Sequence, residues 1–179
     1  MNIARPSAQD MPKYFDRYIE LANTDDLIRS LKAEMRDTQK SIATYSKELI
    51  DFRYAEGKWN LKEILVHLID AERIFAYRAL RIARLDTTPL SGFDEDAYVE
   101  HSNASHRPIK EILKEYKAVR KSTILLFLSF TEEMLDRKGT ASNVEISVRS
   151  MGFTILGHEI HHKKVFEERY LKAIWKPLH

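Results

Sequence analysis

Residues 57–85 read GKWNLKEILVHLIDAERIFAYRALRIARL and carry a complete helix signal. Asn60 is a favoured N-cap residue, and Glu63, three positions later, stands where a capping box needs its acidic member. After Asn60, apolar residues recur at spacings of three and four, which predicts a helix with one buried face that continues to about Leu85. The residues of this face are Leu61, Ile64, Leu65, Leu68, Phe75, Ala79 and Ile82.

Three further segments have the same periodicity. They are Asp25–Leu49, capped by Asn23 or Thr24, Pro108–Leu135, and Val148–Ile174, capped by Ser147. The β-branched stretch Val144–Val148 is too short to indicate a sheet protein. Four long amphipathic helices therefore predict an all-α four-helix bundle, with residues 1–179 forming a single domain.

The connection between the second and third helices, Asp86–Arg107, has 22 residues. Antiparallel neighbours in a bundle need only about 2–8 residues, whereas a connection this long can return along the whole bundle. We therefore expect a crossover that leaves these two helices parallel. Residues 1–23 precede the first helix, and we expect this N-terminal extension to pack on the bundle.

Composition excludes several classes of partner. Hydrophobic residues make up 44% of the chain and charged residues 31%, and the formal net charge is +2, with acidic and basic residues interleaved. No basic face for nucleic acid is predicted. Cysteine is absent, which excludes disulfides and thiolate metal sites. Because no apolar segment reaches the roughly 18 residues of a membrane span, we expect a cytoplasmic protein without a membrane partner.

The seven histidines include a pair that points to metal chemistry. His158 and His162 are four residues apart and, at about 100° per residue, project into the apolar arc that contains Met151 and Ile155. His161 lies toward the edge of this arc. Buried imidazoles need polar partners, and one metal ion satisfies both. The formal His-Glu-x-x-His pattern does not indicate a protease, because neither the downstream ligand nor a sheet-containing scaffold is apparent.

A third ligand is expected from the second helix. His67 borders the apolar arc of that helix. Three histidines without a fourth protein ligand leave a coordination position open, as catalytic sites do. An all-nitrogen set suits zinc, nickel, copper or iron. The alternative is that the three histidines are ordinary core residues.

Other charged residues are candidates for roles at this site. Arg120 and Glu72 both face inward on their helices, which predicts a buried ion pair; alternatively, Arg120 binds an anionic substrate group. Asp70 or Glu72 can orient a ligand histidine, and Glu159 and Asp70 are candidate proton acceptors. On the flank of the second helix, we expect a solvated face formed by Arg78, Arg81 and Arg84.

The segments 57–73 (GKWNLKEILVHLIDAER) and 157–162 (GHEIHH) resemble two signatures of the DinB-like, or YfiT-type, family. Residues 77–84 and 89–95 are similar to one branch of it. The resemblance implies a crossover four-helix bundle, often a homodimer, with a metal on His67, His158 and His162. The family includes S-transferases that use bacillithiol or related thiols, a similar mycothiol-dependent isomerase, and members described as metal-dependent hydrolases.

These observations lead to a functional expectation. We expect a metal-dependent enzyme that acts on a small molecule, namely an S-transferase for a low-molecular-weight, bacillithiol-like thiol. The expected cofactor is a divalent metal ion, zinc or nickel, and the expected assembly is a homodimer. The alternatives are a metal-dependent hydrolase and a non-catalytic metal-binding protein with a stress or interaction role.

Overall fold

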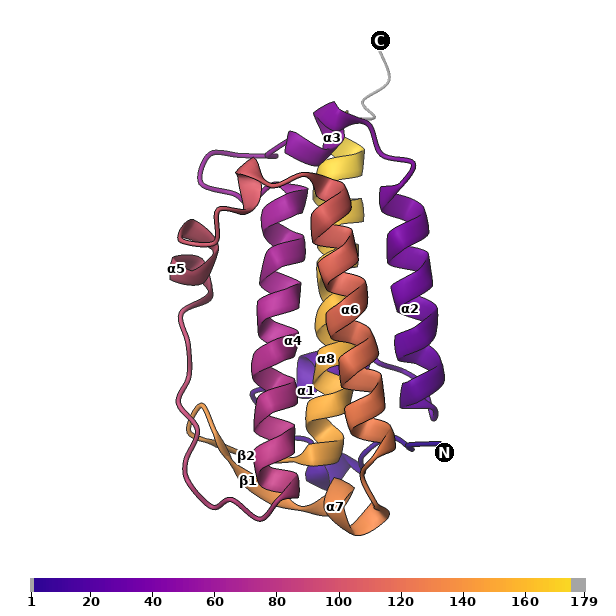
Figure 1. The fold of residues 1–179 in the computed structure, drawn as a ribbon, viewed down its shortest axis with the longest axis vertical. Helices are drawn as coiled ribbons and strands as arrows, with labels where there is room; N and C mark the ends of the chain where they lie inside the picture. Colours follow the sequence, from indigo (N-terminus) through magenta and orange to yellow (C-terminus); the bar gives the residue numbers. More distant parts are fainter. Residues whose placement is uncertain (1, 175–179) are drawn as a thin grey trace.

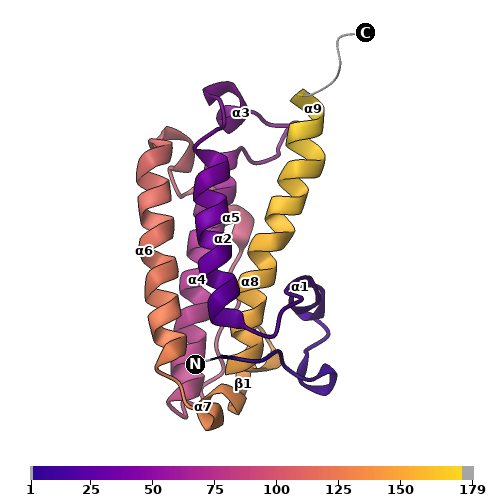
Figure 2. The ribbon, with the colours of Figure 1, turned by 90° about the vertical axis from the view of Figure 1, so that its right-hand side faces the viewer.

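The computed structural model describes residues 2–174, and four long helices dominate it. They are α2 (Leu27–Ile42), α4 (Leu61–Ala83), α6 (Ile109–Leu128) and α8 (Val148–Val165), and they lie side by side (Figures 1 and 2). Helices α2 and α8 run in one direction, whereas α4 and α6 run in the other. The predicted all-α four-helix bundle is confirmed.

The long connection is the predicted crossover. It leaves the lower end of α4 in Figure 1 and climbs the outside of the bundle, so that α6 starts beside the start of α4. On the way it forms α5 (Glu95–Glu100) and a 3₁₀ turn, η2 (Ala104–His106). At its upper end, the Ser105 hydroxyl donates a hydrogen bond of 2.8 Å to Glu63. This contact ties the returning chain to the first turn of α4.

Capping fixes where the helices begin. Glu63 N donates to Asn60 Oδ1 at 3.0 Å and Asn60 N donates to Glu63 Oε2 at 2.8 Å, which is the predicted capping box of α4. Ser147 caps α8 as expected, by accepting from Ser150 N at 3.0 Å. The cap of α2 is Asp26, which accepts from Arg29 N, so the expected cap at Asn23 or Thr24 is wrong.

Two helices are shorter than their apolar patterns predict. The first ends at Ile42 rather than Leu49, and a new short helix, α3 (Lys47–Asp51), is capped by Ser46. At the break, the Thr44 hydroxyl donates to the Ser41 carbonyl at 2.7 Å. Side-chain hydroxyls that bond nearby backbone compete with helical continuation, even where apolar spacing continues.

The third helix is interrupted in the same way. It ends at Leu128 rather than Leu135, and the short helix α7 (Glu132–Asp136) follows. The Thr131 hydroxyl accepts from Met134 N at 3.2 Å and caps α7. The fourth helical segment has the expected extent, because α8 continues into a π-helical stretch (Phe166–Leu171) and α9 (Lys172–Ile174).

A β-hairpin joins α7 to α8. Strands β1 (Lys138–Ala141) and β2 (Val144–Ser147) pair antiparallel, and Ser142 and Asn143 turn between them with φ of 52° and 61°. This hairpin was not expected from the short β-branched stretch Val144–Val148. Leu90 at the start of the crossover pairs with the end of β1, with Leu90 N donating to Thr140 O and Ser142 N donating to Leu90 O, each at 2.9 Å.

The N-terminal extension packs on the bundle, as expected. It contains a 3₁₀ turn, η1 (Ala8–Asp10), and α1 (Asp16–Leu21), which lies against α8 (Figure 2). The approach is close because residue 157 is glycine: a Cβ atom there would lie 1.7 Å from the Tyr18 carbonyl oxygen. Gly157 therefore lets the two backbones touch directly beside His158.

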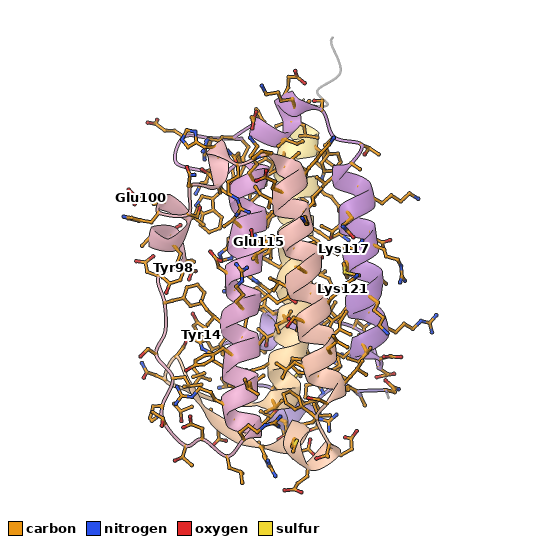
Figure 3. All side chains as sticks on the ribbon, in the orientation of Figure 1. Tyr14, Tyr98, Glu100, Glu115, Lys117 and Lys121 are labelled. Carbon is orange, nitrogen blue, oxygen red and sulfur yellow. The ribbon has the colours of Figure 1, made fainter. Side chains whose placement is uncertain are left out.

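Charged side chains cover the outer faces of the bundle (Figure 3). Lys117 and Lys121, for example, project from α6 and are exposed. Within residues 2–174, none of the helices has the length and apolar character required to span a membrane. His179, one of the seven histidines, lies outside the described residues.

Candidate metal centre

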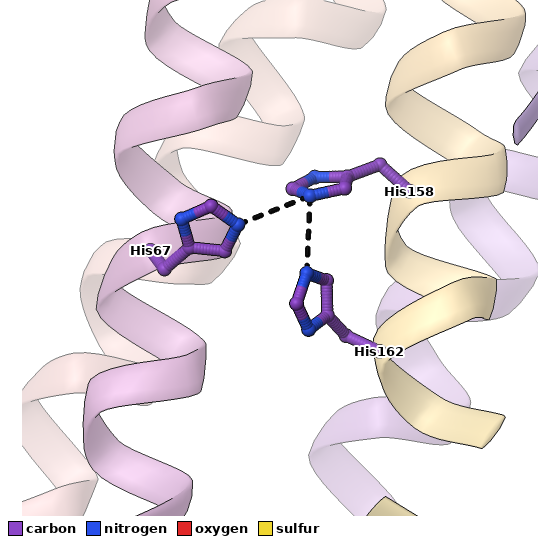
Figure 4. A group of neighbouring side chains, drawn as sticks. All are labelled: His67, His158 and His162. Carbon is purple, nitrogen blue, oxygen red and sulfur yellow. Dashed lines mark hydrogen bonds between the residues drawn. The ribbon is translucent and has the colours of Figure 1, made fainter. Parts of the chain in front are cut away.

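Three imidazoles from two helices converge inside the bundle. His67 approaches from α4, and His158 and His162 approach from successive turns of α8 (Figure 4). The Nε2 atom of His158 lies 3.0 Å from Nε2 of His67 and 3.1 Å from Nε2 of His162. The three candidate ligand atoms all lie within 4.8 Å of one another. The structure thus brings together the three predicted histidines, named here the histidine triad, and leaves His161 outside.

Burial keeps the triad neutral. His67 and His158 are 6% and 7% exposed, and His162 is partly exposed. Burial lowers the pKa of His67 to about 4. Burial also lowers the pKa of His162 to about 3, with a smaller contribution from the neighbouring His67 and His161. It also lowers the pKa of His158 well below its usual value. At neutral pH each ring therefore has one nitrogen with a free lone pair.

The donor set fits a metal ion. Three Nε2 atoms face one point, and a single proton placed between two of them leaves the third without a donor. One divalent cation can accept all three lone pairs, and three histidines are a common ligand set of catalytic zinc, which keeps one position open. Aromatic rings pack beside the triad. The ring centroid of Tyr18 lies 5.1 Å from that of His158, and the ring centroid of Trp59 lies 4.9 Å from that of His67.

Beside the triad lies a buried charge network. Arg120 on α6 is 1% exposed, and its Nε and Nη2 atoms donate to the Glu72 carboxylate at 2.8–3.0 Å. The predicted pair of Arg120 and Glu72 is confirmed. The Nη1 atom of Arg120 lies 2.7 Å from Oε2 of Glu159. Arg120 thus binds two carboxylates and is not among the residues that line the cavity beside His67 and His158.

Glu159 belongs to this network. Its Oε1 atom accepts hydrogen bonds from the hydroxyls of Thr38, at 2.7 Å, and Tyr116. Burial raises the pKa of Glu159, but the Arg120 charge and these hydrogen bonds outweigh it, so the pKa lies below the usual value. The carboxylate is therefore ionised, and its proton-acceptor role stays a prediction.

Asp70 lies on α4 and pairs with none of the residues Arg120, Glu72 and Glu159. Its Oδ1 atom is 3.4 Å from Nη1 of Arg73, and burial raises its pKa despite this neighbour. Neither Asp70 nor Glu72 bonds a triad imidazole within the described residues. Their predicted role in orienting a ligand histidine therefore has no supporting contact in residues 2–174.

Separate cavities reach the triad. His67 and His158 line the first, which encloses about 510 Å³ including its opening and is named here the α4–α5 cavity; its other lining residues are Tyr14, Phe15, Arg17, Tyr18, Ala71, Phe75, Arg78, Phe93, Glu95 and Ser142. His162 lines a second, of about 520 Å³, with Trp59 and Tyr170. It also borders a third, which contains Thr38 and Glu159.

Sequence reasoning missed one residue of the α4–α5 cavity in particular. Arg78, expected on a solvated flank, is only 2% exposed, so that expectation is wrong. A signal existed: Arg78 follows His67 by eleven residues, which returns it to within about 20° of the same helix face. Two further rings lie beside the site: the centroids of Tyr18, in the N-terminal extension, and of Phe75, on the apolar face of α4, are 5.1 and 6.4 Å from that of the His158 ring.

Fold and site together define a class, a crossover four-helix bundle with a buried histidine triad. Residues 30–165 match the DinB superfamily, so the chain belongs to this superfamily. YfiT from Bacillus subtilis, described as a probable metal-dependent hydrolase with an unusual four-helix bundle topology, superposes with a TM-score of 0.73 at 15% identity, over 97% of this chain and 95% of its own. For YjoA, a DinB-like protein of the same organism, the TM-score is 0.57 at 18% identity, over 86% and 94%. No curated protein matches the chain in sequence.

Proposed function

We propose that this protein is a metal-dependent enzyme acting on a small molecule, with His67, His158 and His162 holding a divalent ion, zinc or nickel. The observation that carries the proposal is the convergence of three neutral imidazoles through their Nε2 atoms, with His67 and His158 buried and His162 partly buried. Ordinary core histidines would instead be expected to form hydrogen bonds with other polar groups, because a buried polar atom without a partner is costly. The placement of the triad beside cavities favours chemistry over a purely structural ion.

The chain's own residues prepare the site for reaction. A divalent ion held by the three histidines would lower the pKa of a thiol or water that binds at its open coordination position. Helices α4 and α8 hold the three imidazoles, and the rings of Tyr18, Trp59 and Phe75 pack beside them. A low local dielectric strengthens every electrostatic interaction in the site.

The finer proposal is an S-transferase for a low-molecular-weight thiol of the bacillithiol kind. In this reaction the thiol sulfur bonds to an electrophilic carbon, the bond from that carbon to its leaving group breaks, and the thiol proton departs with the leaving group. A transfer needs room for two substrates. One cavity is lined by His67 and His158, and a separate cavity is lined by His162. This arrangement supports a two-substrate reaction.

A hydrolase is the second candidate. Water would add across a bond of one substrate at the same position, and a single cavity would suffice. The observation that favours it is the similarity in fold to YfiT, which is described as a probable metal-dependent hydrolase. The third candidate, a non-catalytic metal-binding protein with a stress or interaction role, needs the triad but neither cavity.

The expected homodimer and cytoplasmic location stay predictions. Sedimentation analysis of the untagged protein tests the homodimer.

One experiment separates these candidates. Untagged protein is loaded with zinc and incubated with monobromobimane and cysteine, glutathione or bacillithiol, and in parallel with nitrophenyl esters. We expect the protein to bind one zinc per chain. With at least one of the thiols, the thioether should form faster than it does without the protein. His162→Ala should lose both zinc and activity, whereas His101→Ala, a change at an exposed histidine of the crossover, should keep both.

The other outcomes decide between the alternatives. Ester hydrolysis without a thiol would favour the hydrolase, and stoichiometric zinc with neither reaction would favour the non-catalytic protein. A natively folded protein that takes up no zinc, nickel, copper or iron would overturn the metal centre itself.

A further inference from the structure

Arg78 is a buried cation without a buried counter-charge. It lies on α4, is 2% exposed, and forms no ion pair with any residue of the described chain. Its Nη2 atom donates to the Ser91 carbonyl at 2.6 Å and to the Ser142 hydroxyl at 3.0 Å. Its Nε and Nη1 atoms have no hydrogen-bond partner within residues 2–174. Part of the guanidinium is therefore left available.

Comparison with Arg120 shows how unusual this is. Arg120 is 1% exposed, and two carboxylates surround it. Around Arg78 there are instead two neutral oxygens and the rings of Phe75 and Phe93, whose centroids lie 5.6 and 6.0 Å from the guanidinium carbon. Burial lowers the pKa of Arg78, yet an arginine stays charged in proteins. A charge removed from bulk water is stabilised best by an opposite charge, and neither hydrogen-bond partner of Arg78 is charged.

The position of Arg78 relates it to the histidine triad. Eleven residues separate it from His67, which places both on one face of α4 with about 16 Å of helix axis between their Cα atoms. Helical side chains lean toward the helix N-terminus, so the guanidinium points back toward His67. Ala71 and Phe75 lie between them on α4, and all four of these residues line the α4–α5 cavity together with His158.

Other charges at this cavity lie at its exposed rim. Arg17 and Glu95 carry opposite charges and are exposed, as is Tyr14 beside α4 (Figure 3). Water and salt screen exposed charges strongly. The triad imidazoles are neutral, so Arg78 is the one buried charge among the described residues that line this cavity. The interior of the cavity therefore favours an anion.

We propose that Arg78 binds a carboxylate group of the small molecule that reacts at the histidine triad. This inference rests on the proposed function and narrows its substrate to an organic acid, with the reacting atom at the triad and the carboxylate at the opposite end of the cavity. A carboxylate matches better than a phosphate, because one guanidinium balances one negative charge and the cavity has no second buried cation among its described residues.

Calorimetric titration of the full chain with hexanoate and hexanamide tests the proposal. The two probes have the same length and differ in charge. We expect the wild-type protein to bind hexanoate at least about tenfold more tightly than hexanamide, since a hydrogen bond between two charged groups is stronger than one to a neutral amide. Arg78→Gln should abolish this preference, Arg78→Lys should keep part of it, and Arg84→Gln, a change at an exposed arginine just past the end of α4, should keep all of it.

Equal binding of the two probes to the wild-type protein would overturn the proposal, and so would a full preference in a folded Arg78→Gln protein. The wild-type comparison decides the matter even if Arg78→Gln fails to fold. Titrations of metal-free and zinc-loaded protein distinguish the two proposals. A hexanoate preference in protein that takes up no metal would overturn only the metal centre, whereas stoichiometric zinc without a preference would overturn only the role of Arg78.

Discussion

The Nη1 atom of Arg120 lies 2.7 Å from Oε2 of Glu159, the residue directly after His158. The same guanidinium binds Glu72 on α4 through Nε and Nη2. Arg120 thus links α6 to α4 and α8, the two helices that supply the histidine triad. We infer that this network sets the spacing of the triad by holding α4 and α8 at a defined distance.

Replacing Arg120 with methionine should destabilise the protein strongly. The change leaves Glu72 and Glu159 buried without their counter-charge, and breaking a buried pair in this way costs about 3–5 kcal/mol. Urea unfolding of both proteins measures the difference. As a control, Arg73→Gln removes an arginine whose side chain is 49% exposed and pairs with Asp70 and Glu115, and should cost about 1 kcal/mol or less. Equal losses for the two variants would contradict a structural role for the buried network.

The stability of the metal-free protein should fall as the pH falls below about 6.5. The pKa values of His67 and His162 are lowered to about 4 and about 3 in the folded state, from 6.5. Between these values the unfolded chain binds more protons than the folded chain, so the free energy of unfolding decreases with decreasing pH. The stabilisation is fully present above about 6.5. Urea titrations at several pH values check this, and His67→Gln should show a shallower dependence.

Zinc should raise the free energy of unfolding. An ion that binds only the folded state contributes about 4 kcal/mol when its free concentration is about 1,000 times its dissociation constant. Thermal unfolding with and without zinc measures the effect, which His162→Ala should lose. His101 is exposed, and its Nδ1 atom contacts the Ala97 carbonyl, so His101→Ala should retain the full zinc effect. The same stabilisation in both variants would argue against the triad.

Gly157→Ala should detach α1 from α8. The new Cβ atom would lie 1.7 Å from the Tyr18 carbonyl oxygen, a backbone atom that cannot move without displacing α1. Limited trypsin digestion should then cut faster at Lys13 and Arg17. Gly92→Ala is the matched control, because a Cβ atom there would be 3.5 Å from Ser142 Oγ, an ordinary contact. Unchanged digestion of the Gly157 variant would show that α1 is not held by this approach.

Much of the fold could be predicted from local signals. Asn60 and Glu63 mark the start of α4, and Ser147 marks the start of α8, because capping involves residues only three positions apart. The length of the crossover predicted parallel α4 and α6. The ends of α2 and α6 could not be predicted, since apolar spacing continues past Ile42 and Leu128 while hydroxyl groups of Thr44 and Thr131 redirect the backbone.

By itself, the sequence determined the four helices and the inward direction of His158 and His162, because helical periodicity relates side chains on one element. Tertiary structure alone decided what those faces meet. It brought Nε2 of His67 to 3.0 Å from Nε2 of His158 across 91 positions, and it placed Arg78 in the α4–α5 cavity rather than in solvent. The physical reason is that burial and pairing of a charge depend on neighbouring elements, here the crossover and the hairpin, which no periodicity within α4 can encode.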